Sequence, residues 1–240
     1  VETYTAETLP SSTSILSNIP EAPPSFSSSS SFHLKTFGCQ MNVNDSDIVR
    51  SLLQKAGMTE TDQETEADLL LTNTCAIREG AEAKVWHRLR ELRARKRKAP
   101  KTQQKQKRAV IGVLGCMAER LKEDMLKDGM ADIVVGPDAY RDLPRLIQQV
   151  WSPDIPVENA VNVQLSVDET YADITPVRRN PNDTSAFVSI QRGCANRCSF
   201  CIVPFTRGQE RSRPLTSIVE EIRRLVEDEN LKEVTLLGKM

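Results

Sequence analysis

Histidine and aromatic residues are rare in this chain: its 240 residues include two histidines and two tryptophans, and aromatic residues make up 5% of the total. No apolar run approaches the roughly 18 residues that a membrane-spanning helix needs, so no membrane partner is expected. The net charge is −1, so overall charge gives no argument for nucleic-acid binding. Neither a G-x-G-x-x-G motif nor a Walker loop occurs, which argues against a nucleotide-binding domain.

Cysteine is also scarce, but the six cysteines are arranged in an informative way. Three of them share a single loop with the spacing C-x3-C-x2-C: Cys194, Cys198 and Cys201. The other three lie far upstream, one per segment: Cys39, Cys75 and Cys116. The chain shows no secretory signal and is long and helix-rich, unlike a small disulfide scaffold. These features favour metal or redox sites over disulfides.

The first 31 residues are mostly Ser, Thr and Pro with few apolar side chains. Such a composition cannot offset the entropy cost of ordering, so we expect residues 1–31 to be disordered. The stretch contains no Lys or Arg, whereas a transit peptide would be rich in Arg. The chain starts with Val1 and stops just after "VTLLG", and we expect both ends to be those of a fragment or of an unusual gene product.

Residues 32–152 contain four apolar runs, each followed by a helical pattern: "FHLKTFG", "ADLLLTN", "RAVIGVLG" and "ADIVVG". The runs do not alternate with polar residues, which indicates strands buried on both faces. The repeated β-α order predicts one α/β domain with a doubly wound parallel sheet. We expect Asn44 to cap the first helix, which would run from Asp45 to about Ala56.

A looser, Pro-containing linker is expected over residues 153–184. It is followed by a strand, "AFVSIQR", then the cysteine loop, a helix and a last strand, "KEVTLLG". Ser217 and Glu220 form a capping-box pattern for that helix. This order predicts that residues 185–240 are the first units of a (β/α) barrel. A closed barrel takes roughly 250 residues, so the barrel is expected to be truncated.

The upstream cysteines share a topological position, just past the carboxyl end of a predicted parallel strand. Such strand ends meet at one edge of a doubly wound sheet, where these folds bind ligands. Each thiol also precedes a helix, whose N-terminal dipole favours a thiolate. Any one of them alone is best explained as a small buried apolar residue. Together they favour a shared metal ion or cluster.

The downstream loop offers three thiols, whereas a structural zinc ion takes four ligands. The two histidines, His33 and His87, belong to the first domain and give no obvious fourth ligand. Three thiolates suit a [4Fe–4S] cluster that keeps one iron open for a small molecule. The spacing therefore favours an iron–sulfur cluster over zinc.

Several motifs together carry a resemblance: "TFGCQMNVNDSD", "NTCAIREGAE", "GCMAERLK", "GPDAYRDLPRL", "RGCANRCSFCIVPFTRGQERSRP" and "EVTLLG". Over about residues 33–238 the chain resembles the MiaB-type radical S-adenosylmethionine (SAM) tRNA methylthiotransferases. It is most similar to their eukaryotic, often mitochondrial branch of kinase-regulatory-subunit-associated proteins. The resemblance implies addition of a methylthio group to C2 of N6-isopentenyladenosine beside the tRNA anticodon. It also implies a mitochondrial or cytoplasmic location.

The resemblance further implies two [4Fe–4S] clusters and SAM as cofactors. The radical SAM cluster would be held by Cys194, Cys198 and Cys201, and its open iron would bind SAM. An external donor would supply the electron that cleaves SAM and yields a 5′-deoxyadenosyl radical. Cys39, Cys75 and Cys116 would hold a second cluster that carries the sulfur. Phe200 and Arg207 are candidate neighbours of SAM or of the substrate, as are Arg211 and Arg213, although carboxylates could instead hold these arginines in a loop.

Some features keep other interpretations open. Family members usually have a polar residue at Ala195 and often Tyr at Phe200, and they continue beyond "EVTLLG" where this chain stops. A methylthiotransferase for another adenosine or a ribosomal protein is one alternative. Another is a non-catalytic, cluster-binding regulatory protein with a protein partner such as a kinase, and a third is a zinc-binding RNA module.

The basic stretch over residues 87–108 could contact tRNA phosphates, but a solvated helix end is the simpler interpretation. Trp86 and Trp151 are expected to anchor the core rather than to stack on bases.

Overall fold

The computed structural model describes residues 26–27, 29–76, 79–98, 109–127, 129–152, 160–228 and 231–238. Most of residues 1–31, for which disorder was expected, therefore lie outside the described residues. The second part of the basic stretch, residues 99–108, also lies outside them. In the described part, no helix is long and apolar enough to cross a membrane.

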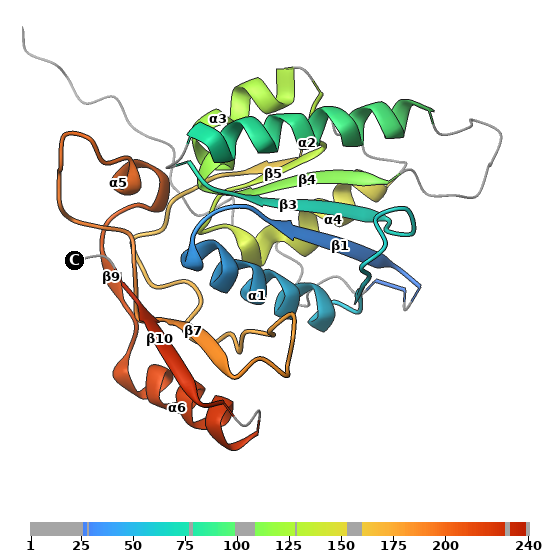
Figure 1. Cartoon of the computed structure of the whole chain (residues 1–240). Helices are drawn as coiled ribbons and strands as arrows, with labels where there is room; N and C mark the ends of the chain where they lie inside the picture. Colours follow the sequence, from blue (N-terminus) through green and yellow to red (C-terminus); the bar gives the residue numbers. More distant parts are fainter. Residues whose placement is uncertain are drawn as a thin grey trace, which may run out of the picture.

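A six-stranded parallel sheet forms the centre of the molecule (Figure 1), which confirms the predicted α/β class. Its order is β2-β1-β3-β4-β5-β6. The strands are β1 (Ser31–Thr36), β2 (Thr59–Glu60), β3 (Leu69–Thr74), β4 (Val110–Gly115), β5 (Ile133–Val135) and β6 (Ala160–Asn162). β6 was not expected: it lies in the segment interpreted as a linker and pairs with β5.

Helices cover both faces of this sheet (Figure 1), which explains why the strands are apolar without alternation. α1 (Gln40–Lys55) and α4 (Leu143–Trp151), the latter preceded by the 3-10 turn η2 (Tyr140–Asp142), lie on one face, and α2 (Glu79–Lys98) and α3 (Cys116–Lys127) on the other. In β3, Leu69 and Leu71 enter the core under α1 and α4, whereas Leu70 enters the core under α2 and α3. Trp151 packs against the first core and Trp86 against the second, in agreement with their expected role.

The first helix begins earlier than predicted. Cys39 is its N-cap and Gln40 its first residue, so Asn44 is a helical residue rather than a cap. The side chain of Asn44 is buried and donates a hydrogen bond of 3.1 Å to the carbonyl of Phe187, 143 residues away. The prediction was wrong because this polar residue serves a tertiary contact rather than the local one that its type suggests.

The second segment, residues 185–238, is a β-α-β unit beneath α1 (Figure 1). Strands β7 (Ser185–Ser189) and β10 (Glu233–Leu237) are parallel and are connected through α6 (Leu215–Glu227). A two-residue antiparallel ribbon, β8 (Gln191–Arg192) with β9 (Arg211–Ser212), closes the base of the cysteine loop, which carries α5 (Val203–Arg207). The predicted strand "AFVSIQR" is thus divided at Ile190, whose amide donates to Leu237 and whose carbonyl accepts from Arg213.

The capping box expected at Ser217 does not form. α6 begins at Leu215, directly after Pro214, so Ser217 lies in its first turn. The Ser217 hydroxyl donates to the carbonyl of Ala172 at 2.6 Å and accepts from Arg213 at 2.7 Å. Partners from other parts of the chain therefore replace the local cap.

Candidate metal and cofactor site

The strand order creates a topological switch point at β1 and β3. β2 lies on the outer side of β1, while β3, β4, β5 and β6 continue on its other side. Parallel sheets bind ligands outside the carboxyl ends of the strands at such a point. Cys39 follows β1, Cys75 directly follows β3, and Cys116 directly follows β4 as the first residue of α3. The three upstream cysteines thus follow three neighbouring strands at one edge.

Cys39 and Cys75 approach each other closely. The turn before Cys39 passes so near that a Cβ on Gly38 would lie 2.7 Å from the Cβ of Cys75. The hydrogen bond with the Cys75 side chain lowers the pKa of the Cys39 thiol to about 5, although burial opposes this shift. The backbone amides of Asn42 and Met41 and the charge of Arg207 also contribute to this lowered pKa of about 5. A thiolate, the form that binds metals, is therefore favoured at this position.

A buried amide pair, Asn42 and Asn73, holds the start of α1 against the end of β3. The Asn42 amide donates to Asn73 Oδ1 at 3.3 Å and to the Thr74 carbonyl at 3.1 Å. Asn73 in turn donates to the Asn42 carbonyl and to Ser46 Oγ, both at 2.9 Å. Both asparagines sit beside cysteines, in "CQMN" and "LTNTC", but nothing in the sequence pattern indicated that they would bind each other.

Cys116 is buried and is contacted by the second segment. Arg207, the last residue of α5, donates from Nε to the Cys116 sulfur at 3.1 Å. That Arg207 lies beside SAM or the substrate stays a prediction, and in the structure Arg207 contacts the upstream Cys116.

The downstream loop places its three cysteines differently. Cys194 is buried, Cys201 is half-buried and Cys198 is exposed. The loop narrows at its base, where the Cys194 amide donates to the Gly208 carbonyl at 3.2 Å and the Cys201 amide closes a turn onto Cys198 at 3.0 Å. Phe200 is 91% exposed, so in this structure it contacts the solvent rather than a formed pocket.

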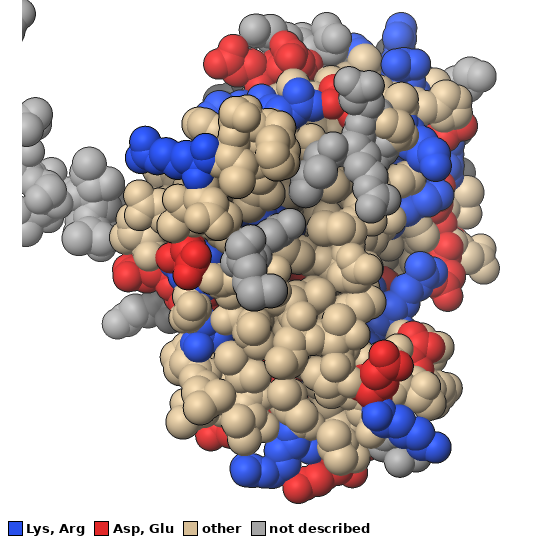
Figure 2. Space-filling model, turned by 60° about the vertical axis from the view of Figure 1, so that its left-hand side comes forward, with Lys and Arg blue, Asp and Glu red and all other residues tan. Residues whose placement is uncertain are grey.

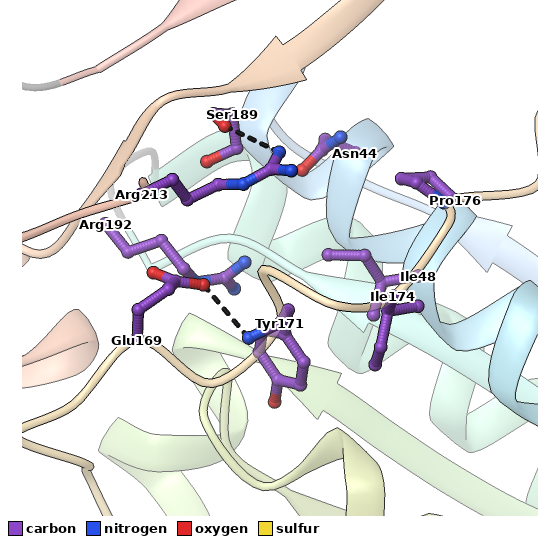
Figure 3. A pocket seen from close by; sticks show the side chains of 9 residues that line it. All are labelled: Asn44, Ile48, Glu169, Tyr171, Ile174, Pro176, Ser189, Arg192 and Arg213. Carbon is purple, nitrogen blue, oxygen red and sulfur yellow. Dashed lines mark hydrogen bonds between the residues drawn. The ribbon is translucent and has the colours of Figure 1, made fainter. Parts of the chain in front are cut away.

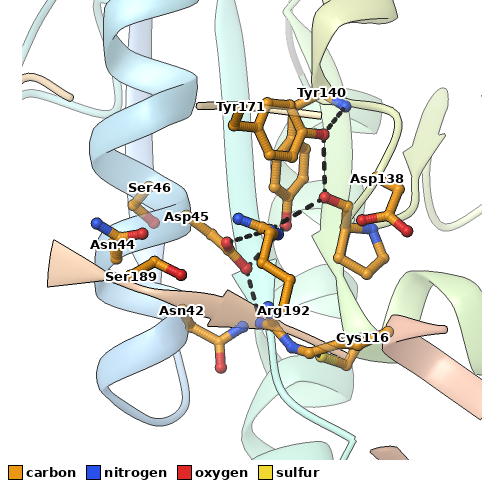
Figure 4. A network of polar contacts seen from close by, with 12 residues as sticks. Asn42, Asn44, Asp45, Ser46, Cys116, Asp138, Tyr140, Tyr171, Ser189 and Arg192 are labelled. Atoms are coloured by element: carbon orange, nitrogen blue, oxygen red, sulfur yellow. Dashed lines mark hydrogen bonds and ion pairs between the residues drawn. The ribbon is translucent and has the colours of Figure 1, made fainter. Parts of the chain in front are cut away.

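A buried carboxylate joins the two segments (Figure 4). Asp45 of α1 is 1% exposed and accepts from Arg192 at 2.6 Å and from Arg207 at 2.7 Å. Tyr140 adds a weaker hydrogen bond to Asp45 at 3.3 Å. Burial opposes the charge of both arginines, yet the Asp45 carboxylate raises the pKa of each above its ordinary value. The sequence analysis missed Asp45 and Arg192, because only the fold brings residues 147 positions apart together.

The other arginines of the motif also pair with carboxylates, and Arg211 does so across the two segments. Arg211 pairs with the buried Asp138 at 2.9 Å, and Arg213 pairs with Glu221 at 2.6 Å. Figure 3 shows Arg192 and Arg213 at the wall of a small hollow between α1 and the second segment. In the described structure Arg207, Arg211 and Arg213 are thus each paired with a carboxylate, which was the alternative given for them.

Several cations in the described part of the basic stretch pair with carboxylates of the same domain. Arg88 and Arg95 both pair with Glu64, and Lys96 pairs with Asp132. α2 has 20 residues, so its basic end lies about 30 Å from the edge where the cysteines gather. Figure 2, which turns the α5 side of the molecule forward, shows charges of both signs around a mainly uncharged centre. Residues 99–108 lie outside the described part of the chain.

The residues present fit thiolate-bound iron–sulfur chemistry better than zinc. In the described residues, no three His, Cys, Asp or Glu side chains form a ready-made ligand group for a metal ion. Each triplet nevertheless supplies three soft sulfur donors, as a cluster with an open iron requires. A fourth zinc ligand is not at hand, because His33 bonds to the Thr61 carbonyl and His87 lies beside Glu91 on α2.

Comparison with known proteins divides the chain in the same way as the structure. The family model described as "Uncharacterized protein family UPF0004" matches residues 31–136, and that of the Radical SAM superfamily matches residues 188–239. Among solved structures, the radical S-adenosylmethionine methyltransferase TsrM from Kitasatospora setae is similar, with a TM-score of 0.51 and 13% identity over 86% of this chain and 47% of that one. At that identity the likeness concerns the fold alone.

Curated relatives are much more similar in sequence. "Mitochondrial tRNA methylthiotransferase CDK5RAP1" of Rattus norvegicus is 56% identical over 86% of this chain and 34% of its own length. "tRNA-2-methylthio-N(6)-dimethylallyladenosine synthase" of Chloroherpeton thalassium is 50% identical over 86% of this chain and 43% of its own length. This chain therefore spans less than half the length of these relatives. Both family models occur in the expected order, and the identity is 50–56% over most of this chain. The resemblance to MiaB-type radical SAM tRNA methylthiotransferases is therefore confirmed over the part of the relatives that this chain spans.

Proposed function

We propose that this chain forms part of a tRNA methylthiotransferase that adds a methylthio group to C2 of N6-isopentenyladenosine next to the anticodon. The observation that carries the proposal is the contact between the two cysteine regions: Arg207, six residues after Cys201, bonds to the sulfur of Cys116. Two thiol triplets on separate segments are thereby brought to one side of the molecule. Such an arrangement suits a reaction that needs a radical source and a sulfur source together.

In this proposal Cys39, Cys75 and Cys116 hold one [4Fe–4S] cluster, and Cys194, Cys198 and Cys201 hold a second one that binds SAM. When bound, the clusters would supply one-electron chemistry and a site for sulfur. The chain itself contributes a thiolate at Cys39, a buried amide pair that fixes the strand ends, and a loop with an exposed Cys198. An external electron donor and a tRNA are the partners that this chemistry requires.

The names of the relatives support the choice of substrate and compartment. The synthase of Chloroherpeton thalassium is named for 2-methylthio-N(6)-dimethylallyladenosine in tRNA, which is the modification proposed here. The rat relative is named as mitochondrial, so we place this protein in the mitochondrion.

Anaerobic reconstitution followed by iron, sulfide and zinc analysis tests the cluster assignment. We expect about eight irons per chain, because two clusters of four are proposed. Changing either cysteine triplet to Ala should leave about four irons, with matching sulfide. The His33→Ala, His87→Ala double variant is the matched control, and it should retain all of the iron.

Other outcomes point to the alternatives. Zinc without sulfide, or loss of zinc from the histidine variant, indicates a zinc module. Loss of all iron on changing one triplet contradicts two independent clusters. If both clusters load but reduced protein does not cleave SAM to 5′-deoxyadenosine, a non-catalytic regulatory role is favoured instead.

A further inference from the structure

The upstream cysteine site contains a cation that comes from the other segment. Arg207 is buried, and its Nε lies 3.1 Å from the Cys116 sulfur. Its Nη2 lies 2.7 Å from Asp45, which fixes the guanidinium in place. Within the described residues, Nη1 has no hydrogen-bond partner although it is buried. The guanidinium of Arg207 thus bridges the Asp45 carboxylate and the Cys116 sulfur, and its Nη1 group is left without an acceptor among the described residues.

A second arginine allows the anchor to be separated from the sulfur contact. Arg192 binds the same carboxylate at 2.6 Å and is equally buried. Its guanidinium also contacts the Pro137 carbonyl and the ring of Tyr171, at 3.3 Å and 4.6 Å. Both arginines therefore fasten the second segment to Asp45, but the sulfur of Cys116 is contacted by Arg207.

The physical consequence follows from the charge and from the donated hydrogen bond. A positive group and an N–H donor beside a cluster thiolate stabilise the more negative, reduced state of an iron–sulfur cluster. Net charge and hydrogen bonds to the sulfurs are among the main determinants of cluster potentials. Burial strengthens the effect, because the surroundings screen the charge less than water does.

We propose that Arg207 is a positioning residue of the upstream site and raises the reduction potential of the cluster held by Cys39, Cys75 and Cys116. Arg207 can do so only while the second segment is docked on Asp45. This inference rests on the proposed function, since it needs the upstream cluster. It adds that the upstream site is composite: the sheet edge supplies the thiols and the radical SAM segment supplies the cation. Separation of the segments would remove the cation from the site.

The test uses the full chain with Cys194, Cys198 and Cys201 changed to Ala, so that only the upstream cluster remains. The midpoint potential of that cluster is measured by a dye-mediated redox titration followed by electron paramagnetic resonance. Arg207→Gln should shift the potential to more negative values, whereas Arg192→Gln should leave it near that of the parent. Arg207→Lys keeps the charge and should recover part of the shift. Thermal unfolding of each variant shows whether the two Gln variants are equally well folded.

The outcomes distinguish this inference from the proposed function. Equal shifts of the midpoint potential in both Gln variants would mean that Arg207 acts only in docking, and they would overturn the inference. An unchanged potential in Arg207→Gln, with its iron retained, would also overturn it. Loss of iron from Arg207→Gln but not from Arg192→Gln supports the composite site. If the parent with the changed loop binds no iron, the upstream cluster itself is refuted, and the inference falls with it.

Discussion

Asp45 is the residue on which the joining of the two segments depends most. It is almost fully buried and accepts hydrogen bonds from two buried arginines of the second segment. Burying three charges is costly, and the cost is offset only while all partners are present. The network therefore makes a poor general stabiliser but a specific connection.

Asp45→Asn tests this view at the scale of one side chain. The change leaves two buried guanidinium groups without a counter-charge, so we expect the free energy of unfolding to fall by about 3–5 kcal/mol. Urea denaturation measures the difference. Asp173→Asn is the matched control: Asp173 pairs with Arg141, but both are largely exposed, so the loss should stay within about 1 kcal/mol. Similar losses in the two variants would contradict the role of Asp45.

At the scale of elements, the cysteine edge depends on how strand β4 passes into helix α3. Gly115 ends the strand with a φ of +91°, a backbone conformation that side chains rarely adopt. A Cβ there would lie 2.5 Å from Asn73 Oδ1 and 2.6 Å from the Thr74 carbonyl. The glycine thus allows Cys116, the next residue, to start α3 against the amide pair.

Gly115→Ala should therefore destabilise the protein by about 1–3 kcal/mol, since it combines backbone strain with a close contact. It should also lower the iron retained by the upstream triplet. Gly80→Ala is the control, because a Cβ at Gly80 meets nothing within 4 Å and alanine is the better helix former. A thermal unfolding series measures both variants, and a loss in Gly80→Ala as large as that in Gly115→Ala would refute the explanation.

At the scale of the whole molecule, the two segments are unequal. The six-stranded sheet buries one large cluster of apolar side chains on each face. The described part of the second segment has one small cluster, whose buried members are Ala186, Val188, Leu225 and Leu231. A two-stranded unit with so small a core is marginal by itself. Its order must depend on docking through the arginine contacts with Asp45 and Asp138.

Hydrogen exchange followed by mass spectrometry tests this dependence. We expect amides of β7 and β10 to exchange faster than those of β3 and β4, because the second segment opens without global unfolding. Asp138→Asn removes the partner of Arg211 and should accelerate exchange in β7 and β10 while leaving β3 and β4 nearly unchanged. Asp173→Asn again serves as the control. Equal acceleration throughout the chain would show a single cooperative unit.

Much of this organisation follows from local sequence patterns. The non-alternating runs in "ADLLLTN" and "RAVIGVLG" indicated strands buried on both faces, and their β-α order indicated a parallel sheet. The position of each upstream cysteine after a strand was also predictable, since parallel strands end at one edge. The family was recognisable from its motifs because the loop spacing and the flanking residues are both unusual.

Only the tertiary structure decided which polar residues meet. Asn44 and Ser217 have the right types for helix caps, yet each binds a distant carbonyl instead. Nothing in the sequence around Asp45 predicts its ion pairs with two arginines, and nothing around Arg207 predicts its contact with Cys116. The sequence alone determined the four central strands β1, β3, β4 and β5, their alternation with helices and the candidate ligands, because these depend on local periodicity. The folded structure decided the buried ion pairs between segments, because their partners are far apart in the chain and are chosen by packing.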